Sequence, residues 1–281
     1  MSLRSFIRTI PGATEVYGAI HAERLQRLSD LEVFLPNSAG PAGERLKVAA
    51  ADAGHAFPFL VELLRSLGRD LPAIVPIQSF PRSAEERAAG ERLAALFERY
   101  GSDKAGAHHD YHHLYGAILA RADIRCMLEI GLGTNNEDVL SNMGAQGKPG
   151  ASLRAFRDYL PQAHVYGADI DRRVLFAEER IQTFYVDQLD LGSFDELARQ
   201  TPEQLDLVID DGLHSPAANI AVLTYAARKQ RAGGWVVIED IVQAALPVWQ
   251  VVAQLLDGWA CQIVQARGGL MFVANRPPAM A

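Results

Sequence analysis

The sequence predicts an α/β fold: a doubly wound, mostly parallel Rossmann-like sheet, preceded by a mainly helical region. Three observations support this prediction. From Cys126 onward, short apolar runs alternate with segments of helical periodicity, which is the order of βαβ units. The apolar runs are continuous, as in strands that helices cover on both faces. Several runs end in glycine or acidic residues, at the place where parallel sheets bind ligands.

The individual elements follow from where each pattern begins and ends. The predicted strands cover residues 126–130, 164–168, 181–187, 205–210 and 235–239, and the helices between them cover 152–159, 193–199 and 215–230. Ser193-Phe-Asp-Glu196 is interpreted as a capping box for the second of these helices. Two last apolar runs, 261–266 and 270–274, flank a glycine pair, which predicts a C-terminal antiparallel hairpin.

The N-terminal part of the chain has a different pattern. Amphipathic pieces such as 60–67 are interrupted by proline and glycine, and the proline-containing segment 69–82 is expected to be a connector. Ser83-Ala-Glu-Glu86 is a capping box that starts a helix running to about Tyr100. We therefore predict an auxiliary, mainly helical region over 1–90 and the α/β domain over 91–281.

Composition narrows the class of protein. The chain has 281 residues and a formal net charge of −7, which argues against a dedicated nucleic-acid binder. No stretch of about 18 uncharged apolar residues is present, so we expect no membrane span. Cys126 and Cys261 lie inside apolar runs and are interpreted as buried free thiols, which fits a reducing cytoplasm.

The first predicted strand ends in an acid and two glycines: Glu129, Gly131 and Gly133. Glycines directly after a strand let the backbone turn sharply and approach a ligand closely. A dinucleotide-binding fingerprint would place a third glycine at position 136, where this chain has Asn136. The pattern favours a ligand site over a purely structural turn, but it does not complete the nicotinamide fingerprint.

The next two strand ends are also polar. Asp169 closes the second strand, where an acid can accept hydrogen bonds from ribose hydroxyls; a solvated strand end is the alternative. It follows Gly133 at more than the usual interval of about 20 residues, because the polar segment 134–150 is inserted as a loop. Asp187 and Gln188 close the third strand, in a position to meet an adenine, with a plain turn as the alternative.

Four carboxylates follow the fourth and fifth strands: Asp210, Asp211, Glu239 and Asp240. Such a group repels itself without a cation, and hard oxygen donors select Mg²⁺, Mn²⁺ or Ca²⁺. His214 follows closely, and its pKa of about 6.5 suits it to accept a proton from a hydroxyl. The alternative is that an aspartate caps the next helix and His214 lies on the surface. The second acidic pair favours the metal.

Residues 108–113 (HHDYHH) are rich in histidine. On a helix, His108 and His112, or His109 and His113, would have the spacing of zinc ligands. No cysteine lies nearby, and a zinc site needs convergent ligands from elsewhere in the chain. A site-lining or surface role is therefore favoured over zinc.

An ordered set of motifs within about residues 97–240 resembles the metal-dependent sugar O-methyltransferases of macrolide biosynthesis. These motifs are Tyr100-Gly-Ser-Asp103-Lys104, His109-x-Tyr111-x-x-x-Tyr115, Leu128-Glu-Ile-Gly-Leu-Gly133, Ala151-Ser-Leu-Arg154-Ala-Phe-Arg157-Asp-Tyr159, Tyr166-Gly-Ala-Asp169-Ile, Ile209-Asp-Asp-Gly-Leu-His214 and Gly233-Gly-Trp-Val-Val-Ile-Glu239-Asp240. The resemblance implies a methyltransferase sheet, whose last strand is antiparallel, and S-adenosylmethionine as the methyl donor.

The resemblance also implies the site residues. Mg²⁺ or another divalent cation would be held by Asp211, Glu239 and Asp240, and His214 would be the general base. The donor would be contacted by residues at the strand ends and on the first helix after them: Glu129, Gly131, Gly133, Ser152, Asp169, Asp187, Gln188 and Asp210. The matching motifs begin after residue 90, and the preceding region is expected to serve in oligomerisation or in covering the site.

The sequence thus predicts a cytoplasmic, S-adenosylmethionine-dependent O-methyltransferase of natural-product biosynthesis that methylates a hydroxyl of a sugar or glycoside. We expect a small-molecule acceptor, no nucleic-acid or membrane partner, and a homo-oligomer. Methylation of a catechol-like phenol is the alternative within the same fold. A nicotinamide-dependent oxidoreductase is an alternative from another class, against which Asn136 argues. A further alternative is a non-catalytic donor-binding protein, and the carboxylates and His214 argue against it.

Overall fold

The computed structural model describes residues 31–278, and the chain divides into two compact units, Met1–Arg69 and Asp70–Ala281. In the first unit, the described part holds a short 3₁₀ helix, η1 (Glu32–Phe34), and the long helix α3 (Ala42–Ser66). Helix α3 begins well before the amphipathic piece predicted at 60–67, because the preceding segment is rich in alanine, the strongest helix former.

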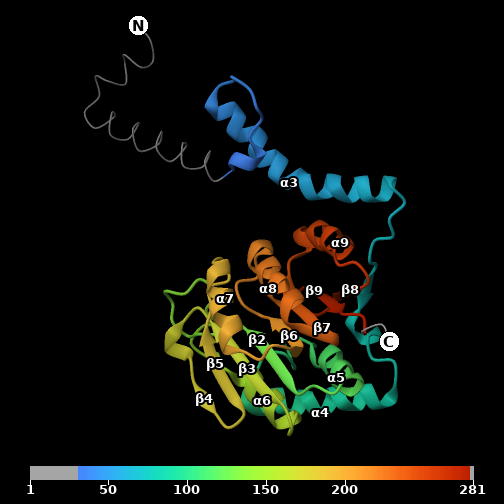
Figure 1. Cartoon of the computed structure of the whole chain (residues 1–281), viewed down its shortest axis with the longest axis vertical. Coiled ribbons are helices and arrows are strands. Elements are labelled where there is room, and N and C mark those ends of the chain that lie inside the picture. Colours follow the sequence, from blue (N-terminus) through green and yellow to red (C-terminus); the bar gives the residue numbers. More distant parts are fainter. Residues whose placement is uncertain (1–30, 279–281) are drawn as a thin grey trace, which may run out of the picture. The chain divides into compact units, whose positions relative to one another are not determined.

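Among the described residues, the second unit forms a nine-stranded sheet. Its strands are β1 (Ile74–Pro76), β2 (Cys126–Ile130), β3 (His164–Asp169), β4 (Ala177–Glu178), β5 (Ile181–Tyr185), β6 (Leu205–Asp210), β7 (Gln230–Ile241), β8 (Ala260–Gln265) and β9 (Leu270–Asn275). Its helices are α4 (Ala84–Tyr100), α5 (His112–Arg121), α6 (Ala151–Tyr159), α7 (Leu191–Gln200), α8 (Pro216–Lys229) and α9 (Leu246–Leu255), with 3₁₀ turns η2 (Ile77–Ser79), η3 (Arg172–Val174) and η4 (Gln243–Ala245). Helices α4, α5 and α6 cover one face of the sheet, and α7, α8 and α9 cover the other (Figure 1).

The strand order is β1-β8-β9-β7-β6-β2-β3-β5-β4. Strands β7, β6, β2, β3 and β5 run parallel, and β9 runs antiparallel to both β7 and β8. The chain goes from β2 outward to β3 and β5, then returns to place β6 on the other side of β2. The order reverses there, and the diverging loops leave a crevice for a ligand. The predicted doubly wound sheet with a C-terminal antiparallel hairpin is confirmed.

Two predicted capping boxes have different outcomes. Ser83 accepts a hydrogen bond from the backbone N–H of Glu86 at 3.1 Å and caps α4, as predicted. The capping box at Ser193 is wrong, because Asp190 accepts from the N–H of Gly192 at 2.9 Å and starts α7 earlier. The Ser193 hydroxyl donates to backbone carbonyls instead.

The predicted connector at 69–82 contributes a strand to the sheet. Strand β1 pairs in parallel with β8, with Val75 opposite Val264. It lies at the edge of the sheet, where Pro76 is tolerated because only one side of an edge strand needs its N–H groups. The α/β unit therefore includes residues before position 90.

Aromatic side chains fill the core on both faces of the sheet. On α6, Phe156 contacts Phe97 and Tyr115 edge to face, at ring-centroid distances of 5.3 and 5.4 Å. On the other face, Trp249 lies against Phe272 at 4.8 Å. Helices α4, α5 and α6 are thereby locked together beneath the central strands.

Two features of the described chain were predicted from its composition: the state of the two cysteines and the lack of a long apolar helix. Cys126 and Cys261 are free thiols, as predicted, but half-buried, because each lies near the first residue of its strand. Burial raises the pKa of both thiols, to about 11 for Cys261. Within 31–278, no helix combines the length and apolarity needed to span a bilayer.

An ion pair joins the start of α4 to the end of α5. Arg121 donates through Nε and Nη2 to the two carboxylate oxygens of Glu86, at 2.9 and 2.7 Å. The hydrogen bond from Arg121 lowers the pKa of Glu86 to about 2. We expect Glu86→Gln to lower the free energy of unfolding by about 1.5–3 kcal/mol near neutral pH, because a charged hydrogen bond is lost.

The pH dependence of that loss has a definite sign. The folded pKa of Glu86 is depressed, so its stabilisation is present above the unfolded pKa of about 4.5 and disappears as the pH falls toward 2. Urea denaturation at pH 7 and pH 3 measures this, with Glu85→Gln at an exposed site on the same helix as the control. Equal losses in the two variants, or a Glu86 loss that does not shrink in acid, would contradict the assignment.

Candidate active site

Two adjoining cavities open at the carboxyl ends of the parallel strands. The smaller has a volume of about 280 Å³, and its lining includes Gly131, Asp169, Asp187 and Gln188. The larger has a volume of about 750 Å³, and its lining includes Lys104, Ser152, His214 and Asp240. Five residues line both: Gly131, Gly133, Ser141, Asp211 and Gly212. The cavities therefore meet between β2 and β6, where the strand order reverses.

Glycine lets the loops after β2 and β6 touch. Gly131 has φ +94°, and a Cβ there would lie 2.0 Å from the backbone oxygen of Asp211. The N–H of Gly131 donates to the carbonyl of Ala168, and the N–H of Asp211 donates to the carbonyl of Ile130, both at 2.8 Å. This close approach places Asp211 between the two cavities.

We expect Gly131→Ala to weaken binding of the methyl donor at least about tenfold. A side chain at positive φ costs about 1–2 kcal/mol, and the clash with Asp211 must also displace the loop. Calorimetric titration with S-adenosylmethionine measures the loss. Gly233→Ala is the matched control, because Gly233 also has positive φ (+80°) but open space around its Cβ position. Unchanged donor affinity in Gly131→Ala would refute the role of this turn.

Asp169 lies buried at the end of β3 and lines the smaller cavity. Its two carboxylate oxygens accept the backbone N–H groups of Leu132 and Asp171, each at 2.8 Å, and burial raises its pKa. Asp171 in turn accepts from Asn136 at 2.7 Å. Asn136, which stands where a dinucleotide-binding fingerprint has its third glycine, thus anchors the loop that follows it.

Asp210 lies behind the crevice. It is fully buried, accepts from Gln188 at 2.8 Å and from Asn219 at 2.7 Å, and lines neither cavity. Burial raises its pKa to about 6. The oxygen of Gln188 accepts from the N–H of Leu213 at 2.8 Å, so this network holds the loop after β6 in place. Asp187 and Gln188, the two residues predicted at the third strand end, both line the smaller cavity.

Lys104 is the cation at the centre of the acidic residues. Its Nζ lies 2.6 Å from Asp211, 2.6 Å from Glu239 and 3.1 Å from Glu129, and its side chain is 2% exposed. Burial opposes the charged form, but the carboxylates raise the pKa of Lys104 well above its ordinary value. Glu129 is fully buried, also accepts from Ser152 at 2.7 Å, and lines neither cavity. It therefore reaches the larger cavity only through Ser152 and Lys104.

Two tyrosines engage the acidic pair at the end of β7. The Tyr111 hydroxyl donates to Oδ1 of Asp240 at 2.5 Å, and the Tyr115 hydroxyl donates to Oε1 of Glu239. Burial and these carboxylates raise the pKa of both tyrosines, which keeps them protonated as donors. Because Lys104 holds the other oxygen of Glu239, both oxygens of that residue are occupied.

Asp211, His214 and Asp240 form a separate group whose ligand atoms lie within 4.8 Å of one another. His214 Nε2 lies 3.7 Å from Asp211 Oδ1 and 4.0 Å from Asp240 Oδ2, too far for hydrogen bonds. These are the two oxygens that Lys104 and Tyr111 leave free. Two carboxylate oxygens and one imidazole nitrogen therefore point to one place in the larger cavity.

The charge around this place fits a divalent cation. Lys104 carries one positive charge, and four carboxylates lie around it: Glu129, Asp211, Glu239 and Asp240. When all of them are ionised, the group has a net charge of −3. Burial raises the pKa of Glu239, a sign of the cost of this crowding. Nδ1 of His214 is buried and has no hydrogen-bond partner among the described residues. A bound dication relieves such an excess.

Curated relatives of the chain are sugar O-methyltransferases. One is the 8-demethyl-8-α-L-rhamnosyl tetracenomycin-C 2′-O-methyltransferase of Streptomyces olivaceus, 28% identical over 86% of this chain and 71% of the relative. Another is the mycinamicin VI 2″-O-methyltransferase of Micromonospora griseorubida, 32% identical over 55% of this chain and 37% of the relative. No family model matches the chain.

A solved structure agrees with these relatives. The MycE methyltransferase of the mycinamycin pathway, in complex with Mg and SAH, has a TM-score of 0.54 to this chain. It is 25% identical, over 66% of this chain and 55% of that one. The chain has the class I S-adenosylmethionine-dependent methyltransferase fold, and its relatives are O-methyltransferases. The predicted enzyme class and family resemblance are confirmed. The match takes in 71% of the length of the tetracenomycin relative and 37% of the length of the mycinamicin VI relative.

Backbone strain in the methyltransferase gathers at the predicted metal and base positions. His214 and Asp240 have φ of +54° and +53°, and in the described part of the chain Arg180 is the other non-glycine residue with positive φ. Such conformations cost about 1–3 kcal/mol each and persist where the surrounding structure enforces them. Ser215 accepts from the N–H of Ala218 and caps α8, so neither predicted aspartate is the helix cap.

The histidine-rich segment of the methyltransferase departs from its predicted spacing. Helix α5 begins at His112, so the proposed i, i+4 pairs do not share a helix. Asp110 accepts from the N–H of Arg267 at 2.8 Å, which holds the preceding residues out of the helix. His108 lines the larger cavity, as expected for a site-lining role. Burial and the neighbouring His113 lower the pKa of His112.

Sequence patterns did not identify three contributors to the methyltransferase site. Lys104, Tyr111 and Tyr115 belong to motifs that carried the family resemblance, yet no role in the site was predicted for them. Tyr115 was expected to face the core, and it is buried. The only sequence signal for all three is that membership, because a lysine beside a turn or a tyrosine on an apolar face is usually a surface or core residue. Their long-range contacts with the acidic residues are visible only in the folded chain.

Proposed function

We propose that this methyltransferase transfers the methyl group of S-adenosylmethionine to a hydroxyl of a sugar or glycosylated natural product, with the help of Mg²⁺ or another divalent cation. The observation that carries the proposal is the convergence of Asp211 Oδ1, Asp240 Oδ2 and His214 Nε2 in the larger cavity, beside the point where it meets the smaller one at Asp211. We call this place the junction. The named activities of the relatives support the same reaction class.

The smaller cavity suits the donor. Gly131 and Gly133 supply a turn that a ligand can approach closely, and Asp169 offers a carboxylate at the place where ribose hydroxyls bind in such sheets. Asp187 and Gln188 line the same cavity at the next strand end, where the adenine is expected. Glu129 and Asp210 lie behind the lining, and we propose that they act by holding the loops.

The larger cavity suits the acceptor and its deprotonation. A sugar hydroxyl placed beside His214 would give its proton to Nε2, which is not hydrogen-bonded to either neighbouring aspartate. The hydroxyl oxygen would then attack the donor methyl carbon in line. The new O–CH₃ bond forms as the S–CH₃ bond breaks, and S-adenosylhomocysteine leaves. Holding both substrates at the junction supplies much of the rate by orientation.

Asp211 and Asp240 are the residues that would hold the cation, because each has one oxygen facing the junction. Glu239 was predicted as a third ligand, and it reaches the same ion only by exchanging its contact with Lys104 or Tyr115. A bound dication would lower the pKa of a coordinated hydroxyl. The surrounding lysine and tyrosines orient the carboxylates.

Calorimetric titration with S-adenosylmethionine, with and without Mg²⁺ and alongside NAD, tests the proposal. We expect saturable donor binding and no NAD signal. Absence of donor binding in folded protein under both conditions would overturn the proposed reaction. Turnover assays with glycosides and with catechols, before and after chelation of divalent ions, then separate the sugar acceptor from a catechol-like phenol.

We also expect this methyltransferase to be a cytoplasmic homo-oligomer that binds neither nucleic acid nor membranes. The net charge of −7 disfavours a nucleic-acid partner. Sedimentation equilibrium of the full chain measures the oligomeric state, and a monomer at micromolar concentration would contradict the expectation.

A further inference from the structure

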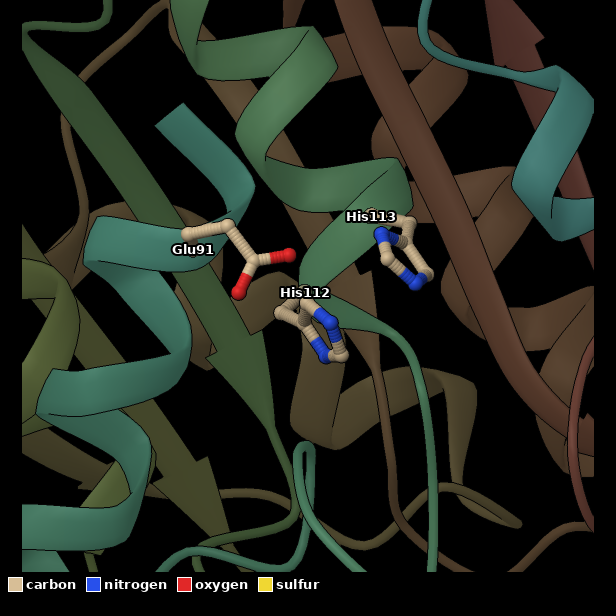
Figure 2. Close-up of side chains that lie close together, drawn as sticks. All are labelled: Glu91, His112 and His113. Carbon is tan, nitrogen blue, oxygen red and sulfur yellow. The ribbon is translucent and has the colours of Figure 1, made fainter. Parts of the chain in front are cut away.

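Three metal-ligating side chains converge away from the catalytic junction. Glu91 on α4 reaches toward His112 and His113 at the start of α5 (Figure 2), and one ligand atom from each lies within 4.8 Å of the others. The two imidazole rings are 4.1 Å apart between centroids and are tilted by 44°. None of these residues lines either cavity of the active site.

The close crossing of two helices creates this convergence. At Gly116, one turn into α5, a Cβ would lie 2.3 Å from the backbone nitrogen of Gly90 on α4. At Gly90, a Cβ would lie 3.0 Å from the carbonyl oxygen of His112. Because both positions are glycine, the backbones pack in contact, and the residue after Gly90 is carried directly over the start of α5.

The atoms of the group are available for a ligand. Nδ1 of His112 is buried and has no hydrogen-bond partner within the residues described, whereas buried polar atoms are normally paired. Glu91 is exposed, so an ion has a path from solvent. The positive end of α5 disfavours a cation, and the Glu91 carboxylate offsets that field.

We propose that Glu91, His112 and His113 form a second metal site, selective for a borderline transition-metal dication such as zinc. Two imidazole nitrogens and one carboxylate are a ligand set that zinc uses, with a water molecule in the fourth position. Mg²⁺ prefers oxygen ligands, so the two sites of this chain differ in the ion they select. Tetrahedral bonds of about 2.0–2.1 Å place ligand atoms roughly 3.4 Å apart, and the ligand atoms here lie within 4.8 Å of one another.

An ion at this site would link α4 to α5. Helix α5 carries Tyr115, whose hydroxyl donates to Glu239, and Tyr111 immediately before it donates to Asp240. The second metal would therefore stabilise the element that orients the acidic pair of the active site, without contacting substrate. The consequence is structural, so metal binding and thermal stability report it independently of turnover.

The experiment is calorimetric titration of the full chain with zinc chloride in excess Mg²⁺, which keeps a magnesium-selective site at the junction occupied. Glu91→Gln and His113→Gln each remove one ligand. Glu85→Gln and His164→Gln are the controls, because they make the same changes at exposed positions outside the group. His214→Asn tests the catalytic junction as the source of any signal. Tm with and without zinc is measured for every variant.

We expect one zinc per wild-type chain and a rise in Tm. Removal of a residue that only hydrogen-bonds to a metal ligand already costs metal sites about 10–100-fold in affinity, so loss of a direct ligand should cost at least as much. The controls and His214→Asn should bind zinc as the wild type does. The proposal is overturned if wild type binds no zinc, if Glu91→Gln and His113→Gln keep full affinity, or if His214→Asn alone abolishes binding.

Discussion

Replacement of His214 should lower turnover by about 10²–10⁴-fold while S-adenosylmethionine still binds with wild-type affinity. The imidazole Nε2 is the one nitrogen in the converging group, and it is not hydrogen-bonded to Asp211 or Asp240. On the proposed function the donor binds in the other cavity, whose lining does not include His214. Single-turnover rates and calorimetric donor affinity together measure this split.

The backbone at position 214 dictates the choice of variant. His214 has φ +54°, and asparagine tolerates that conformation better than alanine does. His214→Asn therefore removes the base with little change in strain, and His214→Ala removes the base and alters the strain. Loss of turnover in both variants assigns the effect to the imidazole. If His214→Asn turns over normally, His214 is not the general base.

Replacement of Lys104 by methionine should lower the free energy of unfolding by about 3–5 kcal/mol, the usual cost of leaving buried charges without their partner. The ammonium contacts Glu129, Asp211 and Glu239 at 3.1 Å or less, and its side chain is 2% exposed. Methionine keeps much of the volume and removes the charge. The loss should therefore come from electrostatics and hydrogen bonding, with little contribution from a cavity.

Denaturant unfolding of Lys104→Met, with and without Mg²⁺, measures the effect. Lys148→Met is the matched control, because Lys148 lines the same cavity but is exposed. On the proposed function, Mg²⁺ should restore part of the lost stability in Lys104→Met, since it supplies positive charge to the same carboxylates. Wild-type stability in Lys104→Met would show that the lysine does not balance the acidic residues.

Much of the fold is visible in the sequence because its signals are local. The apolar runs at 126–130 and 205–210 became β2 and β6 with the predicted bounds, since continuous apolar runs between turn residues can bury both faces. The glycines after β2 have positive φ, as a sharp turn requires. Strand β1 was missed because a three-residue edge strand has too few residues to show a period.

Some features of the candidate site could likewise be predicted from the sequence, and others could not. The acids and His214 were found because each follows a strand, and parallel strands bring their carboxyl ends to one edge. Which oxygen of Asp211 or Asp240 is free depends on Lys104 and Tyr111, from elements more than a hundred residues away in the chain. The same limit applies to Glu91, which meets His112 only because two helices cross at a glycine pair.

Local patterns in the sequence therefore predicted the order of the central strands and the helices between them, the turn glycines, and the acids and histidine at the strand ends. These features follow from hydrophobic periodicity and from the conformational freedom of glycine, which are both local properties of the chain. The tertiary structure alone decided which charges are paired, which ligand atoms remain free, and where α5 begins. Those outcomes depend on side chains that packing brings together from distant elements, and on the burial that sets the cost of leaving a charge unpaired.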